Sequence, residues 1–180
     1  MKKACCINMR ALFFYLLLIM IFSVAACSKS SQEVAELKRF PVDSLDGIIT
    51  QTGIEFDNEI SSDRKGSLRI TVAESTVIRL FEISDISVEN ARLLYQAKVR
   101  TKDIQGQVFL EMWCHFPGKG EFFSRSLQSP LSGTTEWTSI ETPFFLKKGQ
   151  KPDLVKLNLV INGNGTAWID DIHLIKGPLQ

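Results

Sequence analysis

Apolar and polar residues alternate along much of the chain after Pro41, in short runs separated by Gly, Pro, Asn and Asp. Successive side chains of a β-strand point to opposite faces, so this pattern predicts half-buried strands. The predicted strands are Gly47–Gln51, Gly53–Asp57, Ser67–Val72, Thr76–Ile83, Arg92–Thr101, Gln107–Phe116, Glu121–Ser126, Trp137–Leu146, Leu154–Ile161 and Thr166–Lys176.

The middle strands show the alternation most clearly. Tyr95, Ala97 and Val99 share one face, which should point into the core. In the next strand the core set is Val108, Leu110, Met112, Cys114 and Phe116. Cys114 is therefore expected to be a buried thiol that packs as a small hydrophobe.

Many short strands without a long helical period or an internal repeat favour one all-β domain, a jelly-roll β-sandwich over residues 41–180. Asn162–Gly165 is expected to form a tight turn between the last two strands, because Asn and Gly tolerate positive φ.

The first residues have a different pattern. Lys2, Lys3 and Arg10 precede an apolar run from Ala11 to Ala26, which is shorter than the roughly 20 residues of a membrane-spanning helix. The segment therefore predicts a signal peptide over residues 1–26.

The end of that run, Val24-Ala25-Ala26-Cys27, resembles the lipobox of bacterial lipoproteins. The resemblance implies cleavage before Cys27 and attachment of a diacylglyceryl group to its thiol, hence a lipid-anchored protein of the cell envelope. Ser28 after the cysteine resembles outer-membrane sorting in cells with two membranes. An uncleaved anchor helix and a chance cysteine after an ordinary signal peptide are the alternatives.

Residues 27–40 would then form the lipidated cysteine and a short polar tether, with a helical turn at Glu33–Lys38. Without the three basic residues of the leader, the 21 Lys and Arg fall to 18 against 20 Asp and Glu, which offers no electrostatic footprint for nucleic acid. Cys114 is the remaining cysteine and has no disulfide partner within the mature chain.

Three segments together resemble the galactose-binding-like jelly rolls, which include many carbohydrate-binding modules. They are Lys65–Val72, Asn90–Thr101 and, most specifically, Gly165–Leu174, whose sequence is Gly-Thr-Ala-Trp-Ile-Asp-Asp-Ile-His-Leu. The resemblance extends over roughly Asp46 to Lys176 and implies a non-catalytic glycan-binding module. The superfamily also has members that bind no sugar.

Asp170 is the sharpest polar feature, because Trp168, Ile172 and Leu174 are expected on the same strand face. A carboxylate there must be paired, hydrogen-bonded or bound to a cation. Related modules hold a structural calcium ion at such a position, which Asp43, Asp46 or Asp57 would help to bind. The alternative is a carboxylate that accepts loop N–H groups or pairs with Arg69.

Phe109, Glu111, Trp113 and His115 form a second cluster, on the solvent side of their strand. Lys98 and Arg100 are expected on an adjacent strand, so that aromatic and hydrogen-bonding groups form a sugar-binding patch. The alternatives are a second small core, with a loop that covers this face, and a surface that contacts a protein.

No nucleophile with a partner and no close carboxylate pair is evident, so the chain is not expected to be an enzyme. The sequence favours a membrane-anchored lipoprotein with a carbohydrate-binding module. The alternative is a structural or assembly lipoprotein that binds an envelope protein.

Overall fold

The structure, a computed structural model, describes residues 33–179, which form eight β-strands and no helix. The strands are β1 (Ala35–Phe40), β2 (Ile54–Asp57), β3 (Ser67–Val72), β4 (Thr76–Ser84), β5 (Ala91–Phe116), β6 (Gly120–Arg125), β7 (Leu131–Leu146) and β8 (Leu154–Gly177). Within these residues no helix has the length and apolar character needed to cross a membrane. The predicted signal peptide and Cys27 lie outside the described residues.

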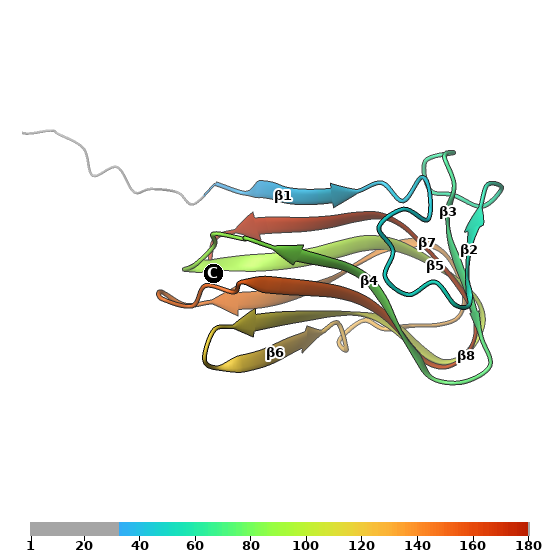
Figure 1. The fold of residues 1–180 in the computed structure, drawn as a ribbon. Helices are drawn as coiled ribbons and strands as arrows, with labels where there is room; N and C mark the ends of the chain where they lie inside the picture. The colour runs from blue at the N-terminus through green and yellow to red at the C-terminus, as the bar shows by residue number, and fades with distance from the viewer. Residues whose placement is uncertain (1–32, 180) are drawn as a thin grey trace, which may run out of the picture. The chain divides into compact units, whose positions relative to one another are not determined.

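The strands form one hydrogen-bonded sheet that folds over itself into two layers (Figure 1). In layer 1, residues 91–101 of β5 and 165–177 of β8 lie side by side, with β7 on one side and β1 and β3 on the other. In layer 2, residues 105–116 of β5 and 154–162 of β8 lie between β6 and β4. This all-β sandwich confirms the predicted fold class.

The hydrophobic core fills the space between the layers. Tyr95 and Val99 of layer 1 are buried, as are Leu110 and Met112 of layer 2, so the predicted inward faces are confirmed. Cys114 is also buried there, and this burial raises the pKa of its thiol to about 12. The thiol therefore stays protonated and packs as a hydrophobic side chain.

The two long strands bend together where they pass from one layer to the other. Gly106 of β5 is paired with Gly163 of β8, and their φ angles are +128° and +138°. A Cβ on Gly106 would lie 2.0 Å from the carbonyl oxygen of Asn162, and a Cβ on Gly163 would lie 1.9 Å from that of Gln105. The close approach of the two backbones therefore requires glycine at both positions.

The predicted turn at Asn162–Gly165 was wrong, because β8 continues through this segment instead of reversing. Residues with positive φ occur in bends within a strand as well as in turns that reverse the chain. Which of the two forms here depends on the strand that pairs with this segment. The two predicted strands on either side are one strand, and the same holds for Arg92–Thr101 and Gln107–Phe116.

Of the other differences, one is that β7 begins at Leu131, six residues before the predicted Trp137. Two more lie near the N-terminus of the domain. Residues 35–40, expected in the tether with a helical turn, form β1 and pair with β8. Gly47–Gln51 is not a strand, although two of its N–H groups donate to Leu80 and Arg79 of β4. Both cases depend on partner strands far away in the sequence, which local patterns do not specify.

We expect the Gly106→Ala substitution to destabilise the domain by about 3 kcal/mol or more, because the added Cβ collides with backbone and forces φ out of its position. Gly118→Ala is the matched control: its φ is also positive, at +71°, but its Cβ would meet nothing within 4 Å. The control should cost only about 1–2 kcal/mol. Urea unfolding measures both values, and equal losses would contradict the role of the crossing.

Candidate functional site

The outer face of layer 2 carries the aromatic and polar side chains that the alternation predicted. β6 and β8 flank β5 in this layer, and cross-strand partners bring their side chains beside those of β5. We call the following residues the layer 2 face: Phe109, Glu111, Trp113 and His115 of β5, Phe123 and Arg125 of β6, and Lys156 and Asn158 of β8.

Glu111 is the centre of this face and is only 3% exposed. Its Oε1 accepts hydrogen bonds from Trp113 Nε1 at 2.6 Å and Asn158 Nδ2 at 3.0 Å, while its Oε2 accepts one from Arg125 Nε at 2.6 Å. Burial works to raise the pKa of Glu111, but these hydrogen bonds and the charge of Arg125 outweigh it, and the pKa is lowered. The ionised carboxylate thus fixes the orientation of three neighbouring side chains.

Trp113 and Phe123 form an aromatic platform next to Glu111. Their ring centroids lie 4.9 Å apart, and the guanidinium carbon of Arg125 lies 4.4 Å from the centroid of Phe123. Phe123 is 51% exposed and Trp113 is half-buried. Since Glu111 holds both Trp113 and Arg125, the platform is ordered before any ligand arrives.

The layer 2 face is open on one half and covered on the other. Phe109 is only 6% exposed and faces Val160 of β8, and both are buried apart from the main core. His115 and Lys156 lie on the open half. His115 Nδ1 is 2.6 Å from an Asp153 oxygen, and Lys156 Nζ is 2.6 Å from a Glu121 oxygen.

Sequence reasoning missed Phe123 and Arg125, because no local pattern of residues indicates which strand pairs with β5.

The structure does not place Lys98 and Arg100 beside Trp113. They precede the bend in β5, so they lie on layer 1. Lys98 Nζ lies 3.3 Å from Asp171, and the guanidinium carbon of Arg100 lies 6.0 Å from the Trp168 ring centroid. The predicted grouping was wrong because two segments expected as neighbouring strands are two ends of one strand.

Asp170 is fully buried, yet it does not share a face with Ile172 and Leu174 as predicted. A bulge at Asp171, whose φ is +49°, shifts the alternation, so that Ile172 and Leu174 enter the core while Asp170 lies outside the sheet. The loop before β3 covers it: Ser62 N donates to Oδ2 at 2.8 Å, and Asp171 N donates to Oδ1 at 2.7 Å.

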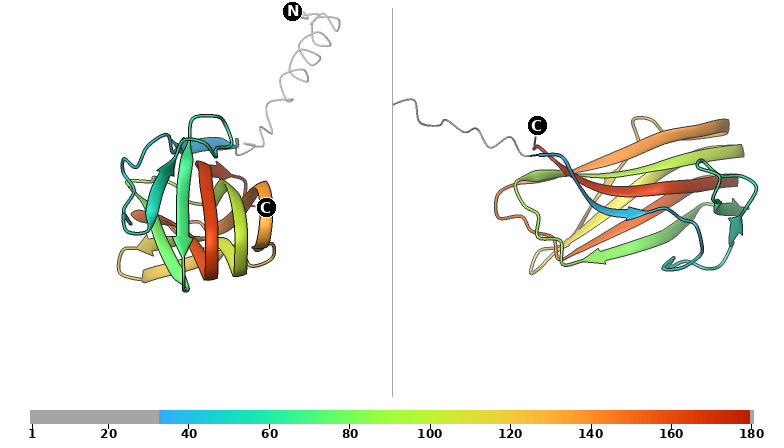
Figure 2. Two further views of the ribbon diagram at one scale, coloured as in Figure 1. Left: turned by 90° about the vertical axis from the view of Figure 1, so that its right-hand side faces the viewer. Right: turned by 90° about the horizontal axis from the view of Figure 1, so that it is seen from above.

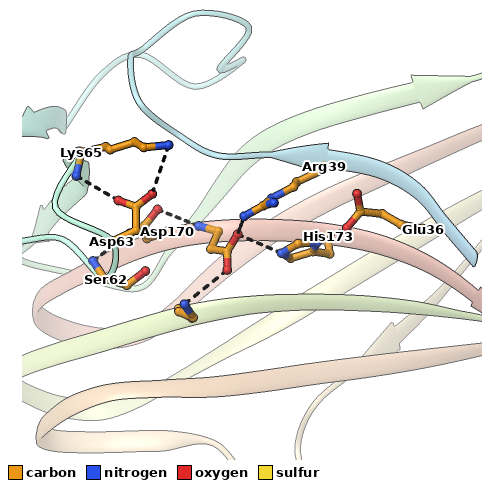
Figure 3. Close-up of polar contacts among 9 residues, drawn as sticks. Glu36, Arg39, Ser62, Asp63, Lys65, Asp170 and His173 are labelled. Atoms are coloured by element: carbon orange, nitrogen blue, oxygen red, sulfur yellow. Dashed lines mark hydrogen bonds and ion pairs between the residues drawn. The ribbon is translucent and has the colours of Figure 1, made fainter.

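Asp171 contacts side chains of the first strand and the last strand. Figure 3 labels three residues of this cluster, Glu36, Arg39 and His173. The carboxylate of Asp171 lies 2.8 Å from Arg39 of β1, 3.3 Å from Lys98 of β5 and 2.9 Å from His173 of β8. His173 in turn lies 2.6 Å from Glu36 of β1. Partial burial works to raise the pKa of Asp171, but the hydrogen bonds from Arg39 and His173 and the nearby charges lower it.

The residues around Asp170 offer little to a metal ion. Within residues 33–179 no group of three or more His, Cys, Asp or Glu is placed to hold one. Asp57 accepts hydrogen bonds from the N–H groups of Glu59 and Ile60 and from Trp168 Nε1. Arg69, the other proposed partner of Asp170, pairs with Glu55 instead. The carboxylate of Asp170 instead accepts hydrogen bonds from the N–H of Ser62 in the loop and the N–H of Asp171 in β8.

Comparison with solved structures identifies the fold. The CBM22-1 xylan-binding domain of Paenibacillus barcinonensis Xyn10C aligns with a TM-score of 0.59 at 12% identity, over 82% of this chain and 97% of that domain. The CBM22-1–GH10 modules of Clostridium thermocellum Xyn10B, complexed with xylohexaose, align with a TM-score of 0.56 at 14% identity, over 82% of this chain and 28% of theirs. The chain has the β-sandwich fold of carbohydrate-binding modules.

The same fold also occurs in an enzyme. A Stig cyclase, Fisc from Fischerella sp. TAU, aligns with a TM-score of 0.54 at 9% identity, over 82% of this chain and 90% of that one. Neither a protein-family model nor a curated protein matches the sequence. The side chains on the sandwich, rather than the sandwich itself, must therefore carry any argument about function.

A thermal melt tests whether the domain binds the calcium ion that the sequence analysis considered at Asp170. We expect the melting temperature to be the same in excess calcium and in excess chelator, because both oxygens of Asp170 already accept N–H hydrogen bonds. Differential scanning calorimetry of the domain in the two conditions is the measurement. A melting temperature that rises with calcium would show that an ion does bind, and loss of that rise in Asp170→Asn would place it here.

Proposed function

We propose that this protein is a membrane-anchored envelope lipoprotein whose domain binds a glycan without catalysing a reaction. The open half of the layer 2 face is the proposed binding surface. The observation that carries the proposal is the platform of Trp113 and Phe123, held beside Arg125 by the buried Glu111. The sandwich fold shared with xylan-binding domains is consistent with it.

The chemistry of this surface suits a sugar. A pyranose ring has apolar C–H faces that pack on aromatic rings, and equatorial hydroxyls that need hydrogen-bond partners at its edge. The platform supplies the aromatic rings. Arg125 and Lys156 lie beside it, and their side chains remain partly exposed and able to donate. Because these groups are already ordered, little side-chain entropy is lost when a glycan binds.

The same geometry argues against catalysis at this face. Glu111 already accepts three hydrogen bonds and its pKa is lowered, whereas a general acid needs a raised pKa and a free proton. Cys114 points into the core and stays protonated, so it offers no nucleophile. Binding is therefore the activity that these residues support.

The lipid anchor is the second part of the proposal and depends on the lipobox-like Val24–Cys27. A diacylglyceryl group on Cys27 would supply the two chains that stable anchoring requires. Ser28 favours the outer membrane where a cell has two membranes.

Binding of an envelope protein is the second candidate function. Exposed aromatic residues next to an arginine are also typical of protein interfaces, and Phe123 with Arg125 has this composition.

For the glycan proposal, we expect the soluble chain from Ser28 onward to bind one class of envelope or plant-wall glycan on an array. Trp113→Ala should weaken binding to that glycan by at least about tenfold, because it removes half of the platform. Trp137→Ala is the matched control, since Trp137 lies on β7 and outside the layer 2 face. A clean array together with a specific protein captured from the native envelope would overturn glycan binding in favour of the second function.

For the anchor, we expect the full chain expressed in bacteria to incorporate labelled palmitate and to fractionate with membranes. Cys27→Ala should abolish the label, because it removes the thiol to which lipid attaches. Cys6→Ala, in the predicted leader, is the control and should leave the label unchanged. Membrane-bound protein without label would instead indicate an uncleaved anchor helix.

A further inference from the structure

A second surface of distinct chemistry lies at the end of the sandwich where β1 begins. Residues of four strands are consecutive neighbours there: Ala35 of β1 pairs with Lys176 of β8, which pairs with Leu93 of β5, which pairs with Phe144 of β7. The connections that follow β5 and β7 lie at this same end in Figure 1, and Figure 2 shows the start of β1 beside the end of β8. The start of β1 therefore lies at this end of the sandwich.

Two phenylalanines and two lysines gather at this end, and we call Lys119, Phe122, Phe145 and Lys147 the tether-end surface. Both phenylalanine side chains are 51% exposed. The four residues line one open groove of about 230 Å³ together with Phe116 and Phe144. Exposed phenylalanines next to each other are costly in water and indicate a surface that contacts something apolar.

The charge of the tether-end surface is positive. Lys119 and Lys147 are exposed, and neither has a carboxylate within ion-pair distance among residues 33–179. The acidic residues of the neighbouring connections are already engaged. Glu89 lies 3.1 Å from Lys151 and accepts a hydrogen bond from Gly149 N, and Asp153 lies 2.6 Å from His115. A partner of this surface should therefore combine apolar groups with negative charge.

We infer that the tether-end surface docks onto the anionic headgroup layer of the bilayer that holds Cys27, with Phe122 and Phe145 inserted at the level of the acyl chains. The inference rests on the lipid anchor of the proposed function. Only seven residues lie between Cys27 and Ala35, so eight Cα–Cα steps join them. Fully extended, they reach about 28 Å at most. Strand spacing puts Phe145, three strands away from β1, at roughly 14 Å from it.

The anchor also explains why a weak contact is enough. Phenylalanine and lysine on one surface are the composition with which peripheral segments bind anionic membranes, and each lysine near such a surface contributes about a fivefold gain in affinity. A domain on a short tether meets its own membrane at an effective concentration in the millimolar range. Docking would fix the orientation of the sandwich relative to the bilayer.

Co-sedimentation with lipid vesicles tests the inference on the soluble chain from Ser28 onward, which lacks Cys27 and contains the whole described core. We expect binding to vesicles that contain phosphatidylglycerol and no binding to pure phosphatidylcholine, with loss at high salt. The charge variant Lys119→Glu with Lys147→Glu should weaken binding by at least about tenfold. The apolar variant Phe122→Ser with Phe145→Ser should do the same.

The controls lie away from the tether-end surface. Val77→Ser removes an apolar side chain of similar exposure, 49%, from β4, and Lys102→Glu reverses an exposed charge near the bend of β5. Both should bind vesicles as the parent does. Thermal melts show whether each variant is folded. Lys119 and Lys147 are both exposed, so the charge variant is expected to fold and to test binding even if the apolar variant unfolds.

The absence of binding to phosphatidylglycerol vesicles would overturn the inference, and so would equal losses in the control variants. Capture of an envelope protein through Phe122 and Phe145 without vesicle binding would also overturn it, in favour of a protein contact. Failure of this inference can be told apart from failure of the proposed function. Lipid attachment is tested by palmitate labelling of Cys27 in the full chain, and glycan binding is tested with the Trp113→Ala variant.

Discussion

The backbone crossing of β5 and β8 at Gly106 and Gly163 is the constraint on which the rest of this structure depends. Two antiparallel strands stay hydrogen-bonded through both layers, and they pass between layers at a point where no Cβ fits. Every other strand attaches to one of these two, apart from the short β2, which pairs with β3. Because of this crossing, the two ends of β5 lie in different layers. The end that contains Lys98 belongs to layer 1, and the end that contains Trp113 belongs to layer 2.

The bulge at Asp171 has a comparable effect on β8. It shifts the alternation by one residue, so that Ile172 and Leu174 fill the core while Asp170 and Asp171 remain outside it. Asp170 then fastens the loop before β3, and Asp171 fastens β1 through Arg39. Burial without a paired cation raises the pKa of Asp170, whereas the cations around Asp171 lower its pKa. Because β1 is held in this way, the start of β1 lies at the same end of the sandwich as Phe145 of β7.

Sandwiches of this kind carry unrelated functions, as the similarity to both xylan-binding domains and a cyclase shows. In this chain a buried, hydrogen-bonded Glu111 lies beside a partly exposed aromatic platform. A carboxylate used in this way orients its neighbours and has no proton to give. The arrangement therefore supports recognition, and the groove around Phe122 and Phe145 supports a second contact whose chemistry differs from the first.

The all-β class, the inward faces of the middle strands and the burial of Cys114 could be predicted from residue order, because side-chain alternation is a local property of a strand. The same alternation indicated Glu111 and Trp113 as outward residues. Strand pairing was needed to show that Asn162–Gly165 bends a strand instead of ending it and that residues 35–40 are a strand. It was also needed to show that Lys98 lies in the other layer from Trp113, while Phe123 and Arg125 lie beside Trp113. Each of these features depends on which distant strand supplies the hydrogen-bond partner. A local pattern of residues does not specify that partner strand.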